Sequence, residues 1–376
     1  LENKINYRFS KNNSFIDISG SVYEDLREKN NSKYEYLPNI LFGKTFFLEK
    51  FGTIDFTSDN SYRNYKVDKH LSTNTNTVIW TPLNYISRLG FVNSLEGQIK
   101  NTNYDAVNTT DYKTDGLINE LSGVLKLKSS IPMKKESTRF SNILSPNFML
   151  RYAPGHMKDL KSDDLILKYA NLYSTNKTNE IESGFSSILG FDFKHNEKNN
   201  GVEKEKLSIS VGQVFSPEKN KDLPSASSLD QKMSDVVGEI KYNFSEIGTI
   251  DYKFSLDHNY NDFNYNEVAT TLNFGKVGFN IDYLEEQNHV GRENYVNAGV
   301  SINFNDNNKF SFETKKNFRT SSTELYDMAY QYTNDCLTAG LVFRREFYED
   351  SDLEQKDTLM FMITFVPFTG AKAPLK

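Results

Sequence analysis

A two-residue alternation of apolar and polar side chains is the sequence feature that most constrains the fold of this chain. It is clearest near the C-terminal end, between Tyr326 and Phe368. Apolar residues there occupy every second position, at Tyr326, Met328, Tyr330 and Tyr332, then at Leu337, Ala339, Leu341, Phe343 and, past Arg345, Phe347, and finally at Leu359, Phe361, Ile363 and Phe365. Side chains two residues apart along a strand lie on the same face of a sheet. The pattern therefore predicts antiparallel strands joined by a short turn at 333–336 and by a charged loop at 349–357.

The same alternation recurs along most of the chain, for example over 250–256, 277–283 and 296–304, and no long stretch of helical periodicity interrupts it. About 19 strands are predicted, in a range of about 18–20, because strand ends are fixed only to within a few residues. Their length of about 9–13 residues is close to the ~9–11 residues that a tilted strand needs to cross a bilayer. Residues 1–376 are therefore interpreted as one all-β domain.

The composition agrees with a sheet that is apolar on one face only. Hydrophobic residues make up 37 % of the chain, yet aromatic residues reach 14 %, with 22 Tyr and 28 Phe. Neither helices nor a solenoid repeat are available to cover so long an apolar face. We therefore expect a bilayer to cover it, and closure into a transmembrane antiparallel β-barrel to satisfy the strand edges. The net charge of -6 and the interspersed acids and bases exclude a nucleic-acid footprint.

The predicted connections alternate in length. Long ones fall at 27–36, 105–115, 153–179, 216–232, 284–293 and 349–357, short ones mostly lie between them, and 131–139 and 195–205 are exceptions of medium length. Outer-membrane barrels place tight turns at the periplasm and longer loops outside. An odd strand count would place Leu1 outside, whereas bacterial single-chain barrels have even counts. Either the count is off by one or the first barrel strands are missing from this sequence, and the start of the chain without Met or a signal peptide favours the second explanation.

Three segments resemble parts of one known family. They are Tyr332-Thr333-Asn334-Asp335-Cys336-Leu337 with Gly340 and Arg345; the final strand, from Asp357-Thr358-Leu359 to Val366-Pro367; and a middle segment with Leu144-Ser145-Pro146, Tyr152-Ala153-Pro154, Asp163-Asp164 and Tyr169-Ala170-Asn171-Leu172-Tyr173. These segments are similar to the C-terminal part of the LPS-assembly outer-membrane proteins (LptD, also called OstA). The resemblance implies part of a barrel of about 26 strands in the outer membrane of a Gram-negative bacterium. It also implies that an N-terminal periplasmic domain and the first barrel strands are missing from this sequence.

The resemblance also implies a function and several partners. The family releases lipopolysaccharide through a seam between its first and last strands, so the last strand, with Leu359, Phe361, Ile363 and Phe365, would form one side of this lateral gate. It implies a disulfide between Cys336 and a cysteine of a missing N-terminal domain. The implied partners are lipopolysaccharide, an LptE-like plug lipoprotein, an LptA-like periplasmic bridge and the barrel-assembly machinery.

The chemistry-bearing residues give no sign of an enzyme, a metal site or a cofactor. The five histidines lie far apart. Asp257 and His258 are adjacent in a predicted strand, so we expect their side chains to face opposite ways. The acidic run Asp350, Asp352, Glu354 and Asp357 lacks calcium-loop spacing and is interpreted as a solvated loop. Arg344 and Arg345 are also expected on opposite faces; the inward one could contact a phosphorylated glycolipid, although ordinary lumen lining is the favoured interpretation.

The favoured function is thus lipopolysaccharide translocation and insertion at the outer membrane. The alternative is a general diffusion porin or a TonB-type receptor barrel. A porin would carry an inward constriction loop and a C-terminal Phe, and a TonB-type receptor would carry a plug domain upstream.

Overall fold

The computed structural model describes residues 2–24, 34–66, 69–108, 116–155, 157–178, 180–199, 201–244, 246–287, 292–334, 336–347 and 356–365. These residues form 21 antiparallel strands in one sheet. The short strands β6 (Tyr85–Ile86) and β9 (Met133–Glu136) were not among the about 19 predicted from the alternation. The predicted all-β fold is confirmed. Within the described residues, no helix has the length and apolar character needed to span a membrane.

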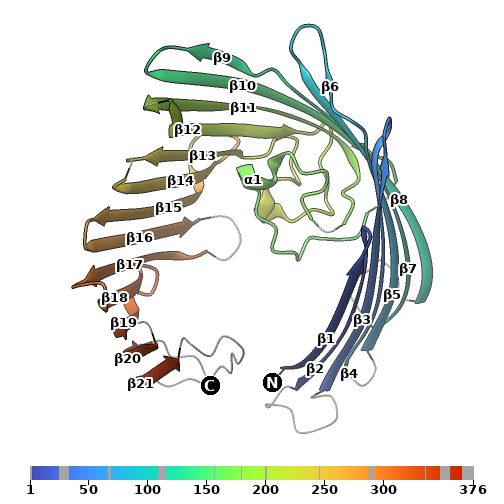
Figure 1. The fold of residues 1–376 in the computed structure, drawn as a ribbon. Coiled ribbons are helices and arrows are strands. Elements are labelled where there is room, and N and C mark those ends of the chain that lie inside the picture. Colours follow the sequence, from blue (N-terminus) through green and yellow to red (C-terminus); the bar gives the residue numbers. More distant parts are fainter. Residues whose placement is uncertain are drawn as a thin grey trace. The chain divides into compact units, whose positions relative to one another are not determined.

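The chain divides into two compact units, of which the first contains residues 1–133, 144–191 and 212–235. Its long strands pair antiparallel in chain order, and β8 pairs with β10 (Figure 1). They are β1 (Glu2–Lys11), β2 (Ser14–Glu24), β3 (Tyr34–Leu48), β4 (Gly52–Lys66), β5 (Lys69–Thr81), β7 (Val92–Val107) and β8 (Gly116–Ser130). Four more strands have residues in both units: β9, β10 (Phe140–Ala153), β11 (Gly184–Asn199) and β12 (Val202–Phe215).

The second unit contains residues 134–143, 192–211 and 236–376. From β13 onward it is an uninterrupted meander in which each strand pairs antiparallel with the next (Figure 1). The strands are β13 (Val236–Asn243), β14 (Gly248–Leu256), β15 (Phe263–Phe274), β16 (Val277–Glu286), β17 (Asn294–Asn303), β18 (Asn308–Asn317), β19 (Ser322–Thr333), β20 (Leu337–Glu346) and β21 (Lys356–Phe365).

The register gathers apolar side chains on one face of the meander. Phe361 lies opposite Leu341, and Leu359 lies opposite Phe343. Phe361 and Leu359 are 70 % and 69 % exposed, so this face is not covered by any described part of the chain. A large, continuous apolar surface is unfavourable in water and suited to a bilayer.

The opposite face of the meander carries paired charges, for example on β13, β14 and β15. Lys253 on β14 lies opposite Glu267 on β15, and their side chains form an ion pair at 2.8 Å. On the other side, Lys253 lies opposite Glu239. One position along, Lys241 and Asp251 are also opposite each other. Such cross-strand pairs are compatible with a hydrated surface, so the sheet has one apolar and one wet face, as the alternation predicted.

The connections of the meander mostly alternate in length. The turns at 244–247, 275–276 and 334–336 are shorter than the loops at 257–262 and 287–293. The connection at 318–321, however, is no longer than the turn at 304–307. The predicted segregation of turns and loops is therefore confirmed for most of the meander. In the predicted charged loop at 349–357, residues 349–355 lie outside the described residues, whereas Lys356 and Asp357 belong to β21 and not to a loop.

Two predicted connections of medium length were wrong. Residues 195–205 are not a connection, because β11 continues to Asn199 and β12 begins at Val202. In the stretch 131–139, β9 pairs with β10, and the Ser137 amide donates to the Phe140 carbonyl at 2.8 Å. Both stretches contain several Lys and Glu residues, and these charged residues hid the strands from an argument based on apolar positions.

Candidate functional site

Two segments of the first unit leave the sheet and fold onto its polar face. The first inserted segment (residues 154–183) joins β10 to β11 and contains the helical turn α1 (Tyr169–Leu172) (Figure 1). It is bounded by Gly155 and Gly184, whose φ angles of +97° and +110° are accessible to glycine at little cost. The second inserted segment (216–235) joins β12 to β13 and contains the short 3-10 turn η2 (Ser225–Ser227).

The inserted segments have an apolar core of their own. Leu160 and Leu172 are fully buried, and Leu167 is almost so. The Leu172 side chain lies directly over Gly212 of β12, at a position where any larger residue would overlap it. The Leu160 amide donates to the carbonyl of Asp222 at 2.8 Å, which ties the first inserted segment to the second. The two segments therefore form one packed body, the inserted body, rather than two separate loops.

Side chains of β7 hold the first inserted segment on the polar face. Gln98 accepts a hydrogen bond from the Asn176 amide at 2.8 Å. Two neighbours on the same face of β7 also bind the segment: Glu96 accepts from the Thr175 hydroxyl, and Lys100 pairs with Glu180. Alternate residues of β7 thus bind successive parts of the insertion, as the two-residue period of a strand requires.

A buried cluster of charges lies where the insertion meets β10. Arg151 is 2 % exposed; its guanidinium donates to the Thr175 carbonyl and, at 2.8 Å, to the Asn176 side chain. Lys177 is 8 % exposed, and burial lowers the pKa of its ammonium group, against a smaller opposing effect of Glu182. The Glu182 carboxylate accepts the backbone N–H groups of Lys177 and of Thr178, the latter at 3.1 Å.

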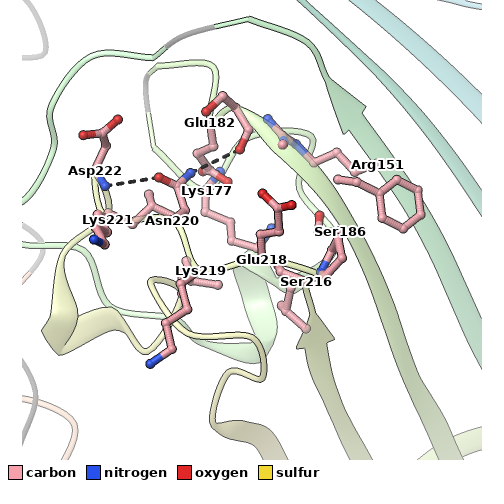
Figure 2. A pocket seen from close by; sticks show the side chains of 17 residues that line it. Arg151, Lys177, Glu182, Ser186, Ser216, Glu218, Lys219, Asn220, Lys221 and Asp222 are labelled. Atoms are coloured by element: carbon pink, nitrogen blue, oxygen red, sulfur yellow. Dashed lines mark hydrogen bonds between the residues drawn. The ribbon is translucent and has the colours of Figure 1, made fainter.

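These charges border a cavity of about 560 Å³. Figure 2 shows Arg151 on its strand, with Lys177 and Glu182 on the first inserted segment; the other walls come from the second inserted segment and from the adjoining ends of β11 and β12. The remaining lining residues are Ser183, Gly184, Phe185, Ser186, Val214, Ser216, Pro217, Glu218, Lys219, Asn220, Lys221, Asp222, Leu223 and Leu229. The volume is within the range of about 300–1,000 Å³ typical of small-ligand sites.

The structure places the two predicted arginines on opposite faces. Arg344 donates to the Asp327 carboxylate at 2.8 and 2.6 Å and shares with it the polar face. Arg345 makes a two-pronged ion pair with Asp357, at 2.7 Å for both bonds. It lies on the apolar face, opposite Tyr326 and beside the Phe347 ring. The sequence did not decide which of the two arginines faces inward; the register with Asp327 assigns Arg344 to the polar, inward face.

The other predicted site residues lie near the C-terminal end. Cys336 is exposed in the turn between β19 and β20, where its amide donates to the Asn334 side chain at 3.0 Å. The four gate residues predicted on the last strand alternate along β21 and lie opposite β20; they are Leu359, Phe361, Ile363 and Phe365. β21 is described to Phe365, whereas the strand was predicted to reach Phe368. The disulfide and the gate stay predictions.

The expectation for Asp257 and His258 was wrong. β14 ends at Leu256, so both residues lie in a turn, and the His258 Nδ1 is 2.8 Å from the Asp257 carboxylate. The rule that adjacent residues face opposite ways applies only within a strand. Two other histidines have polar neighbours: His195 contacts Asn142, and His70 lies 3.9 Å from Asp105. His156 and His289, like the acidic residues 350, 352 and 354, lie outside the described residues.

Sequence reasoning missed the inserted body and with it the cavity. It treated 153–179 as an irregular loop on the outer side of a barrel. The overlooked signal was a set of apolar residues too dense for a solvated loop: Met157, Leu160, Leu165, Leu167, Leu172 and Ile181, all buried. Their spacing follows neither the helix nor the strand period, so a search for periodicity passed over them.

Comparison with known families identifies the chain. The model of the family "LptD: LPS transport system D" matches residues 2–318. The chain belongs to the LptD family. The match includes β1–β18 and the inserted body. It ends before the Cys336 turn and the last strand, two of the three segments on which the resemblance was based.

Membership of the LptD family identifies the sheet as that of an outer-membrane β-barrel and points to a Gram-negative outer membrane. The family is a component of a transport system, not a catalytic family. No curated protein matches the chain.

Several solved outer-membrane proteins share a similar arrangement of strands. The siderophore receptor PirA from Acinetobacter baumannii has 8 % identity and a TM-score of 0.44, over 96 % of this chain and 70 % of that one. A mutant ferric enterobactin receptor from Pseudomonas aeruginosa, in complex with enterobactin, gives the same values. The copper transporter OprC has 9 % identity and a TM-score of 0.35, over 96 % and 69 %. No functional argument follows from likeness at this level.

Proposed function

We propose that this chain is the barrel component of a transporter that translocates lipopolysaccharide and inserts it into the outer membrane. The observation that carries the proposal is the match of the LptD family model to residues 2–318. The two faces of the sheet suit such a cargo. Rows of ion pairs such as Lys253 with Glu267 favour a hydrated saccharide, and the exposed apolar face favours acyl chains.

In this proposal the saccharide passes along the polar face while the acyl chains leave through a seam that includes β21. Leu359, Phe361, Ile363 and Phe365 then form the apolar side of the seam. No covalent step takes place, and the energy comes from outside the barrel through an LptA-like periplasmic bridge. An LptE-like lipoprotein plugs the lumen, and the barrel-assembly machinery inserts the chain.

Two polar residues have proposed roles in the same process. Arg344 contacts phosphate groups of the passing glycolipid, since a guanidinium forms strong charge-assisted bonds to phosphate. Its bonds to Asp327 hold it on the polar face. Cys336 forms a disulfide to an N-terminal domain. Its exposure leaves the thiol accessible to a partner cysteine, and disulfides persist in the oxidising periplasm.

Depletion of the protein in its native host tests this function. Lipopolysaccharide exposed at the cell surface should fall as the protein is lost, while newly made lipopolysaccharide accumulates behind the outer membrane. Unchanged surface lipopolysaccharide, together with loss of siderophore uptake or of small-solute diffusion, would instead support a TonB-type receptor or a porin.

A further inference from the structure

The Lys177 ammonium group is buried without a direct partner of its own. Among the described residues, none forms an ion pair or hydrogen bond with its Nζ atom; the hydrogen bond from Lys177 to Glu182 is donated by the backbone amide. Glu182, the acid that most affects Lys177, uses its carboxylate to accept backbone N–H groups. A buried charge without a partner is costly, so such an arrangement needs an explanation.

The charges around Lys177 do not balance within the described residues. Arg151 and Lys177 are two buried cations, and Glu182 is their one buried carboxylate. Lys126, the register partner of Arg151, is already paired with Glu96 at 2.9 Å. One positive charge is therefore left without a matching carboxylate in the wall of the cavity.

The other charged lining residues do not remove this excess. They are two acids, Glu218 and Asp222, and two bases, Lys219 and Lys221, so their formal charges sum to zero. Glu218 and both lysines are exposed, so solvent screens their charges. Hydroxyl groups of Ser186 and Ser216 also line the cavity and provide donors for an oxygen-rich ligand.

We propose that this cavity is a binding site for an oxyanion, a phosphate or a carboxylate, which pairs with Lys177 next to Arg151. The anion supplies the missing negative charge and places it against two buried cations. The cavity of about 560 Å³ also has room for a sugar that carries the anion. The proposal deepens the proposed function, because a phosphorylated saccharide is the form in which the proposed cargo would present such a group.

Calorimetric titration of the whole protein in detergent tests the site. The probes are inorganic phosphate, glucosamine 6-phosphate and uncharged N-acetylglucosamine. Both phosphate probes should bind and the uncharged sugar should not. Tighter binding of glucosamine 6-phosphate assigns the site to a sugar phosphate, whereas equal binding of both assigns it to the oxyanion alone.

Two variants test whether the binding of the phosphate probes depends on Lys177. Lys177→Met should weaken both phosphate probes about tenfold or more, the usual effect of losing a charge-assisted hydrogen bond. Lys161→Met is the matched control, because Lys161 lies on the same inserted segment but is exposed and paired with Asp159; its affinity should equal that of the unchanged protein. Lys177→Met should also fold, since methionine is similar in length and removes a buried charge. Heat-modifiable mobility on gels checks this.

The proposal is overturned if neither phosphate probe binds, if the uncharged sugar binds equally well, or if folded Lys177→Met binds both phosphates with unchanged affinity. These results would leave the proposed transport function untouched, because the depletion experiment does not involve the cavity. Conversely, anion binding that depends on Lys177 would still support the site even if the depletion experiment contradicted the transport function.

Discussion

The packing of Leu172 on Gly212 makes the most detailed prediction about the inserted body. Leu172 is fully buried, so Leu172→Ala should destabilise the attachment of this body by about 2–5 kcal/mol, the usual range for a buried leucine. Gly212→Ala should cost about 1–3 kcal/mol, because its new Cβ atom overlaps the Leu172 side chain and lies 3.0 Å from the Leu189 carbonyl oxygen. In the double variant, the alanine at 212 fills part of the space left by Leu172. The combined cost should therefore be smaller than the sum of the two.

Limited proteolysis measures these differences at the inserted segment. When opening and closing are fast, the cleavage rate follows the population of the open form. A loss of 2 kcal/mol then accelerates cleavage within 154–183 about 30-fold. The matched control is Leu121→Ala on β8, where the side chain is 70 % exposed and its removal should change nothing. The sheet itself should keep its heat-modifiable mobility in all variants, because strand pairing does not depend on Leu172.

Two outcomes would refute this reasoning. If Leu172→Ala leaves cleavage at 154–183 unchanged, the inserted body is not held by this contact. If the costs of Leu172→Ala and Gly212→Ala add fully in the double variant, the two residues are not packed against each other.

Three further predictions concern single residues. Asp327→Asn should lower stability by at most about 1 kcal/mol, because Arg344 is half-exposed, and a large drop in melting temperature would contradict this. Cys336→Ser should abolish any reductant-sensitive shift of the full-length protein on gels; a shift that survives the substitution would exclude this thiol from the disulfide. Burial lowers the pKa of Lys177, so the unfolded segment binds more protons than the folded one, and stability should rise as pH increases toward about 10.4, the ordinary pKa of lysine. Lys177→Met should remove that rise in proteolysis assays, and an undiminished rise would assign it to another group.

The sequence predicted the sheet well because the sheet obeys a local rule. The apolar positions of β19 and β20 were assigned to the correct face, and the turn at Cys336 was placed correctly, since both follow directly from a two-residue period. The separation of Arg344 from Arg345 followed from the same rule. Which of them lies on the polar face was decided only by the register with Asp327.

The candidate cavity was beyond the same reasoning. Arg151, Lys177 and Glu182 come from a strand and a loop that approach each other only after the inserted segment folds back. That folding depends on irregularly spaced leucines and on contacts such as Lys100 with Glu180, which join residues far apart in the sequence. Neither the irregular leucine spacing nor these long-range contacts can be recognised from a short stretch of sequence. The contact between His258 and Asp257 was missed for a related reason, because it depends on the strand ending at Leu256, before either residue.

Photo-crosslinking in living cells at Ile363 tests the central claim most directly. A photoreactive residue at Ile363 on β21 is compared with one at Phe279 on β16, because both lie on the apolar face near the short-turn ends of their strands. At this depth, which we assign to the periplasmic side, the surrounding lipid should be phospholipid. The account predicts a lipopolysaccharide adduct at Ile363 that exceeds the one at Phe279 and disappears when lipopolysaccharide supply is stopped. Equal adducts at the two positions, or no adduct at Ile363, would contradict it.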